Sequence, residues 1–89
     1  MERDYPILIP AVILNDNRLS PFDKIMFGEI NVLSNRNGFC FAQNSYFAKK
    51  YNTSIRTVQR SLNTLSDLMY IVIVNENNKR RIYTFLERE

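Results

Sequence analysis

The apolar residues of the chain fall into periodic stretches separated by polar clusters. From Phe22 to Leu33 they recur three or four positions apart, which is the spacing of one helical face. Ser20 and Pro21 are typical of an N-cap and a first helical position, and Asp23 suits the positive end of the helix dipole. A helix is therefore expected from Pro21. Its buried stripe should be Phe22, Ile25, Met26, Ile30 and Leu33, with Lys24, Glu29 and Asn31 on other faces.

A glycine within this helix and a turn cluster after it predict how the neighbouring elements are arranged. Gly28 weakens a helix, so we expect another element to pack closely against it. The cluster NRNG at 35–38 predicts the end of the helix and a turn. The run GFCFA that follows is short and apolar, and it predicts a strand near 39–42.

The stretch 45–65, SYFAKKYNTSIRTVQRSLNTL, predicts two short helices with a break at 52–54. Asn52 tolerates the left-handed backbone that ends a helix, and Thr53 or Ser54 can cap the next one. The apolar side of the first helix should consist of Tyr46, Phe47 and Tyr51.

The second helix is expected over 54–66 and is strongly two-faced. At 100° per residue, one face is apolar and the opposite face is polar and free of acids. The apolar face consists of Ile55, Val58, Leu62 and Leu65. The polar face consists of Arg56, Arg60, Asn63 and Thr64, with Thr57 and Gln59 at its edges.

Three residues link the two helices in a recognisable spacing. Ala48, Asn52 and Val58 reproduce that of a helix-turn-helix, in which a small residue allows close approach and the turn is tight. Any small α-helical hairpin can show the same spacing, so this alternative remains open.

A β-hairpin is predicted after the second helix. YIVIV at 70–74 and IYTFL at 82–86 read as strands, and NENNKRR at 75–81 reads as a polar turn. In a winged helix-turn-helix such a hairpin is the wing, which lies against the DNA backbone. The expected fold is therefore α+β: one winged helix-turn-helix domain over 1–89, with three main helices, a C-terminal wing and a short extra strand near 39–42.

Charge is distributed unevenly around a net charge of +3. From Ile30 to Arg81 eight basic residues stand against two acids, a balance of +6, which leaves −3 for the rest of the chain. The eight are Arg36, Lys49, Lys50, Arg56, Arg60, Lys79, Arg80 and Arg81. This polarity favours a single nucleic-acid face, because Lys and Arg gain affinity by displacing counterions from phosphates.

The expected contacts divide by chemistry into base contacts and backbone contacts. Arginine pairs bidentately with guanine and side-chain amides pair with adenine, whereas phosphate contacts only position the protein. Base contacts are expected from Arg56, Arg60, Asn63 and Gln59. Backbone contacts are expected from Lys49, Lys50, Ser54, Thr57, Thr64, Lys79, Arg80 and Arg81. The alternative for each arginine is a solvated surface residue or a weak ion pair.

Other chemistry finds little support in the residues. The chain has no histidine and one cysteine, its acids are scattered singly, and it has no Gly-rich phosphate loop. We therefore expect neither an enzyme nor a metal or cofactor. Cys40, between Phe39 and Phe41, should be a buried small hydrophobe.

The N-terminal part bears on location and association. No apolar run approaches the roughly 18 residues of a membrane helix. Pro6 and Pro10 interrupt an apolar run unlike a secretory signal, so a cytoplasmic protein of a bacterial or phage-infected cell is expected. The apolar segment 7–14 should pack on the core, with use in a homodimer as the alternative.

Longer motifs carry a resemblance. IPAVILNDNRLS, LSPFDKIMFGEINVLSN, NGFCFAQNSYFAKKYNTSIRTVQRSLNTL and DLMYI together resemble the N-terminal winged helix-turn-helix domains of replication initiator and replisome organiser proteins from phages and plasmids of Gram-positive bacteria. The resemblance implies binding to repeated duplex DNA sites at an origin. It also implies a separate C-terminal part that recruits helicase machinery, so helicase loading is not expected of these 89 residues.

The chain departs from the family pattern at three positions. Gln43 replaces a capping serine or threonine, Thr53 an apolar turn residue, and Met69 a glycine that ends the recognition helix. Two other functions stay open: a transcriptional repressor with the same DNA contacts, and a winged helix used for protein contacts. The second would show an exposed apolar patch and weak, salt-insensitive DNA binding.

Overall fold

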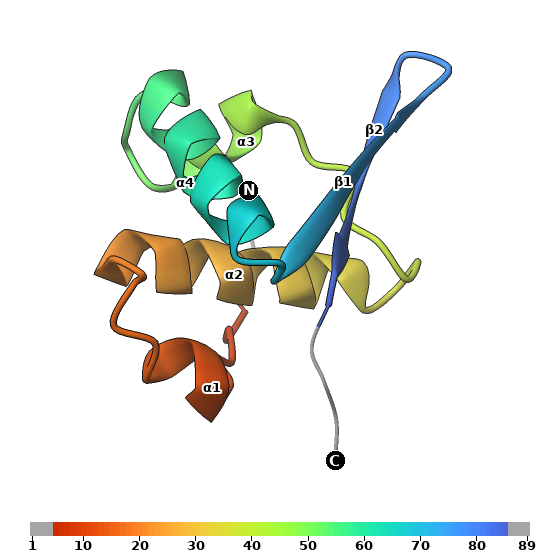
Figure 1. The fold of residues 1–89 in the computed structure, drawn as a ribbon. Coiled ribbons are helices and arrows are strands. Elements are labelled where there is room, and N and C mark those ends of the chain that lie inside the picture. Colours follow the sequence, from red (N-terminus) through yellow and green to blue (C-terminus); the bar gives the residue numbers. More distant parts are fainter. Residues whose placement is uncertain (1–4, 86–89) are drawn as a thin grey trace.

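The computed structural model describes residues 5–85. Within them the elements are α1 (Ala11–Leu14), α2 (Pro21–Ser34), α3 (Asn44–Lys50), α4 (Ile55–Asp67), β1 (Ile71–Glu76) and β2 (Lys79–Thr84). Helix α2 crosses the middle, with α1 on one side and α3, α4 and the antiparallel hairpin on the other (Figure 1). The α+β winged helix-turn-helix prediction is confirmed. None of the helices in residues 5–85 has the length and apolar character needed to cross a membrane.

The start of α2 is fixed by the predicted cap. The Ser20 hydroxyl accepts a hydrogen bond from the Asp23 amide at 3.1 Å, and the Asp23 carboxylate accepts one from the Ser20 amide at 3.0 Å. This capping box satisfies two amides that the first turn would otherwise leave unpaired. Asp23 also accepts the hydroxyl proton of Ser61 on α4 at 2.6 Å, so the same carboxylate ties α4 to α2.

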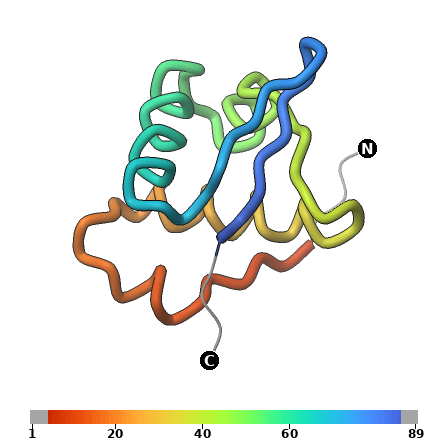
Figure 2. Tube along the Cα trace, turned by 45° about the vertical axis from the view of Figure 1, so that its right-hand side comes forward, coloured from red at the N-terminus to blue at the C-terminus, as the bar shows by residue number. Residues whose placement is uncertain are grey.

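The prediction that one stripe of α2 is buried is too narrow. Phe27 and Glu29, which lie outside the predicted stripe, are both fully buried. The cause is the N-terminal segment, which runs back along α2 and covers a second side of it (Figure 2). A Cβ added at Gly28 would lie 3.2 Å from Ile7 Cδ1 and 3.3 Å from Ile9 Cγ1, so the predicted close packing at this glycine is confirmed.

The core joins every layer of the fold. Ile13 of α1 is fully buried, which confirms that the N-terminal segment packs on the domain itself. Cys40 is buried as predicted, and burial raises the pKa of its thiol. The other buried apolar residues are Leu19, Met26, Phe27, Ile30, Phe47, Ala48, Val58, Leu62, Leu65, Ile71 and Ile82.

The turn between α3 and α4 has the predicted geometry. Asn52 adopts a left-handed conformation with φ of 54°, and the Thr53 amide donates to the Ala48 carbonyl at 2.9 Å. This is the Schellman arrangement, which ends a helix abruptly. Ser54 then caps α4 by accepting from the Thr57 amide. Thus the helix-turn-helix break at 52–54 is confirmed.

The hairpin differs from its prediction in the extent of its turn. Asn77 and Asn78 form a two-residue connection with φ of 52° and 65°, as a type I′ turn requires. The strands therefore continue to Glu76 and from Lys79, and the predicted loop over 75–81 is wrong. Asparagine tolerates positive φ, so this two-residue turn forms without a glycine.

The extra strand expected near 39–42 is reduced to one bridge residue. Cys40 pairs with Ile82 through two backbone hydrogen bonds of 2.8 Å. At Ala42 the carbonyl accepts from the Arg80 side chain instead of a strand, because the chain already turns toward α3. The segment 39–41 still lies along β2.

Met69 carries a backbone conformation that glycine would adopt without strain. It has φ of 68° directly after α4, and its side chain is 64% exposed. Because the left-handed region costs an L-residue about 1 kcal/mol, we expect Met69→Gly to raise the melting temperature by roughly 4–8 °C. Asn52→Gly is the control, with a smaller expected gain because asparagine tolerates this region. A lower melting temperature for Met69→Gly would contradict the argument.

Candidate nucleic-acid interface

Helix α4 presents the predicted polar face to solvent. Val58, Leu62 and Leu65 are fully buried, and Thr57 and Thr64 lie half-buried at the edges. The exposed polar side chains of α4 are Arg56, Gln59, Arg60, Asn63 and, at its last residue, Asp67. Ile55, expected on the buried face, is 54% exposed because it is the first residue of α4 and lies where the helix begins. We call the four side chains of Arg56, Gln59, Arg60 and Asn63 the α4 face.

The two arginines of the α4 face are exposed. Among residues 5–85, neither the Arg56 nor the Arg60 guanidinium forms an ion pair or a hydrogen bond. Asp67 is the acid nearest to them along α4, at its last residue. An unpaired guanidinium keeps all five donors for a ligand.

A chain of side-chain hydrogen bonds connects the hairpin to the α4 face. Arg80 Nη1 donates to Asn44 Oδ1 at 2.8 Å, and Asn44 Nδ2 donates to Gln59 Oε1 at 2.9 Å. Gln59 Nε2 then donates to Asn63 Oδ1 at 3.0 Å. Three elements, β2, α3 and α4, therefore fix the two amides that were predicted as adenine contacts. Asn44 was not among the site residues predicted from the sequence.

The Arg80 side chain is engaged in this series of hydrogen bonds and is only partly exposed to solvent. Its Nη2 donates to the Ala42 carbonyl at 2.6 Å, and burial lowers the pKa of its guanidinium. Strand alternation separates it from its neighbours: Lys79 is exposed, and Arg81 stacks over the Phe39 ring at 4.6 Å. Of the three predicted wing contacts, Lys79 and Arg81 lie on the outer side of β2.

Lys50 also has partners within the protein. Its Nζ lies 3.1 Å from Glu29 Oε2 and 4.0 Å from the centre of the Tyr5 ring. Although burial acts against the charged form, the contacts with Tyr5 and Glu29 raise the pKa of Lys50. Lys49, one position earlier, is exposed. The two lysines, predicted together as phosphate contacts, therefore differ in what they can reach.

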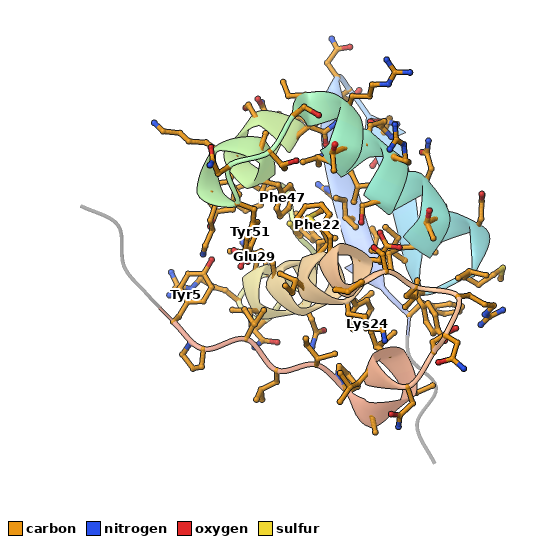
Figure 3. The ribbon with its side chains drawn as sticks, turned by 90° about the vertical axis from the view of Figure 1, so that its left-hand side faces the viewer. Tyr5, Phe22, Lys24, Glu29, Phe47 and Tyr51 are labelled. Carbon is orange, nitrogen blue, oxygen red and sulfur yellow. The ribbon has the colours of Figure 1, made fainter. Side chains whose placement is uncertain are left out.

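Glu29 is the centre of a buried polar cluster. Its carboxylate accepts hydroxyl protons from Tyr51 at 2.6 Å, from Tyr46 at 3.0 Å and from Tyr5. Burial alone would raise the pKa of this carboxyl, but the tyrosine hydroxyls and Lys50 outweigh burial and lower it. Figure 3 shows Tyr5 and Tyr51 gathered around Glu29. The cluster joins the N-terminal segment, α2 and α3.

Hydroxyls predicted at the DNA backbone have local partners. Ser54 Oγ donates to Thr57 Oγ1 at 3.0 Å, and Thr64 Oγ1 donates to the Arg60 carbonyl at 3.1 Å. The Ser54 cap sets the start of α4. The hydroxyl donors of Ser54 and Thr64 are thus engaged, whereas Thr57 Oγ1 only accepts in these bonds and keeps its proton for a phosphate.

The parts of the candidate interface lie at one end of the molecule. In Figures 1 and 2 the hairpin tip, α3 and the first turns of α4 share the side away from α1. The arrangement joins a polar helix face to a basic strand, which is a surface suited to a nucleic-acid duplex.

Comparison with protein families agrees with this geometry. A family model described as a helix-turn-helix domain matches residues 17–71. The match spans α2, α3 and α4 and ends at the first residue of β1. Neither a curated protein nor a solved structure matches the chain.

Proposed function

Because the chain belongs to the helix-turn-helix domain family, we propose that it binds duplex DNA sequence-specifically, with α4 as the recognition helix in the major groove. The observation that carries the proposal is the α4 face: two arginines without a partner among residues 5–85 and two ordered amides, on the side of α4 opposite its buried residues. The width of a major groove admits one α-helix, and such side chains match its base edges.

The roles on the α4 face follow from donor and acceptor chemistry. Arg56 and Arg60 each pair bidentately with a guanine. Asn63 Oδ1 already accepts from Gln59, but a carbonyl oxygen accepts twice and the Asn63 amino group remains free for adenine. Gln59 positions Asn63 and contacts a neighbouring base.

Backbone contacts come from the residues around the α4 face. Lys79 and Arg81 on the outer side of β2 and Lys49 on α3 supply cations for phosphates. Ser54, Thr57 and Thr64 lie at the start and edges of α4. Thr57 donates its hydroxyl proton to a phosphate, and Ser54 and Thr64 reach phosphates through bridging waters that donate to both oxygens. The internal contacts of Lys50 and Arg80 favour supporting roles for these two residues.

The finer function proposed is recognition of repeated sites at a phage or plasmid replication origin in a bacterial cytoplasm. The resemblance of the sequence to initiator domains supports it. A transcriptional regulator would contact DNA with the same residues. Self-association would appear as cooperative occupancy of adjacent repeats.

The decisive experiment is selection of the domain against a random duplex library, followed by titration of the recovered sites at two salt concentrations. A defined motif, bound far more tightly than random DNA, is the expected result. Tandem copies within or beside the gene favour initiation, and a palindrome over a promoter favours regulation. No enrichment, with weak and salt-insensitive binding, would overturn the proposal.

Removing the two outer cations of β2 should weaken binding to every duplex alike. We expect the double substitution Lys79→Ala and Arg81→Ala to lower affinity about tenfold and to flatten the salt slope by about 2, because each phosphate contact contributes about 1. Titration of selected and random duplexes over a range of salt measures both. Arg36→Ala, in the turn after α2, is the matched control. An unchanged slope in the double variant would remove the wing from the interface.

A further inference from the structure

The outer face of the hairpin carries a second set of side chains suited to a ligand. The Cys40–Ile82 bridge places the segment 39–41 beside β2. Because Cys40 points into the core, alternation directs its neighbours Phe39 and Phe41 to the outer side of the hairpin. There the Phe39 ring lies 5.8 Å from the Tyr83 ring and 6.2 Å from the Phe41 ring. Aromatic rings from two segments therefore form a continuous surface next to the cations of β2.

A cleft opens at the tip end of this surface. It has a volume of about 400 Å³, within the range of sites that hold a small ligand or part of a larger one. Its lining residues are Phe39, Phe41, Gln43, Asn78, Lys79, Arg80 and Arg81. Three of them are cations and none is an acid.

Phe41 is the unusual member of this lining. Its side chain is 63% exposed, which is unusual for a large apolar ring. The same residue borders a second, more apolar hollow of about 280 Å³ with Leu33, Ala42 and Tyr46. The ring is thus accessible from more than one side. An exposed aromatic ring beside three cations, of which only Lys79 has an acid, Glu76, across the hairpin, indicates a ligand with both flat apolar groups and negative charge.

We propose that this cleft binds single-stranded nucleic acid, with a base stacked on Phe41 and the adjacent phosphates on Lys79 and Arg81. Single strands offer unstacked bases to aromatic side chains, whereas the bases of a duplex are already stacked on one another. Charge complementarity selects this occupant over an apolar protein segment, because three cations line the cleft and only one described acid, Glu76, stands across the hairpin from one of them, Lys79. None of the α4-face residues lines the cleft. Lys79 and Arg81 serve both proposals, whereas Phe41 belongs to the cleft alone and Arg60 to the α4 face alone.

The test compares two ligands and two surfaces. Fluorescence anisotropy measures binding of the 89-residue chain to a labelled oligothymidine of about 20 nucleotides and to a mixed-sequence duplex. We expect Phe41→Ala and Phe41→Leu to weaken oligothymidine binding about tenfold or more, and Phe41→Tyr to retain it because its ring still stacks. Duplex binding should change less than about twofold in all three. Arg60→Ala should show the reverse pattern.

Several results would overturn the inference, and they differ from those that bear on duplex binding. Unchanged oligothymidine binding in Phe41→Ala and Phe41→Leu, with melting temperatures showing that both fold, would exclude the cleft. Equal loss of both ligands in Arg60→Ala would mean a single shared surface. Self-association that Phe41→Ala abolishes, without oligothymidine binding, would make the cleft a protein contact. Phe41-dependent oligothymidine binding without duplex binding would support the cleft and overturn the α4 proposal alone.

Discussion

Replacing Glu29 by glutamine is expected to lower the free energy of unfolding by about 3 kcal/mol, or the melting temperature by roughly 12–24 °C. The fully buried carboxylate accepts hydrogen bonds from Tyr5, Tyr46 and Tyr51 and neutralises Lys50. Glutamine keeps the size of the side chain but removes the charge and turns one acceptor into a donor. The hydroxyls that donate to that oxygen must then reorient to accept, which breaks the present arrangement. The Lys50 side chain is 23% exposed, so it can turn toward water, and the loss stays near the lower end for a broken buried pair.

The same cluster should make the free energy of unfolding depend on pH in the acidic range. The folded-state pKa of Glu29 lies below its ordinary value of 4.5, so its contribution is fully present above pH 4.5 and is lost as the pH falls through the folded pKa. Urea unfolding at neutral and acidic pH should therefore show a smaller loss on acidification for Glu29→Gln than for the unaltered chain. Glu76→Gln, at an exposed hairpin position, is the control. Parallel losses in Glu29→Gln and the unaltered chain would contradict this role of Glu29.

Local signals predicted the elements that depend on neighbours in sequence. The Ser20 and Asp23 cap and the Asn52 turn are settled within a few residues, and the structure has both. The burial of Glu29 could not be read in this way. It depends on the N-terminal segment folding back over α2, a contact between residues 24 positions apart.

The hairpin shows where an available signal was misread. The run 75–81 is polar throughout, which reads as a loop, yet two adjacent asparagines suit a type I′ turn and let both strands continue. With β2 starting at Lys79, alternation places Arg80 on the other side from Lys79 and Arg81. The separate role of Arg80 then follows from the strand period.

The candidate site divides in a similar way. Amphipathic spacing in α4 was enough to identify the α4 face, because burial of one side determines which residues remain outside. The contribution of Asn44 was not accessible, since it depends on the distance from the start of α3 to both Gln59 and Arg80. Periodicity describes one element at a time, whereas such a chain of amides needs three placed together.

Replacing Arg60 by alanine should separate base recognition from general attraction to DNA. Its guanidinium is exposed on α4 and unpaired among the described residues, and a bidentate guanine contact discriminates by about 1–3 kcal/mol. We therefore expect roughly 10- to 100-fold weaker binding to the selected site. Random duplex, which lacks the matched guanine, should lose less than about threefold. Competitive titration of both duplexes at one salt concentration measures the ratio.

The control for Arg60→Ala must remove the same charge from another place. Arg36→Ala does so: the start of α2 contacts α4 through Asp23, whereas Arg36 lies beyond the other end of that helix. It should weaken both duplexes slightly and equally, through long-range attraction alone. Equal losses on selected and random DNA in Arg60→Ala would make Arg60 a phosphate contact. Discrimination would then have to come from Arg56 and from the amides held by Asn44.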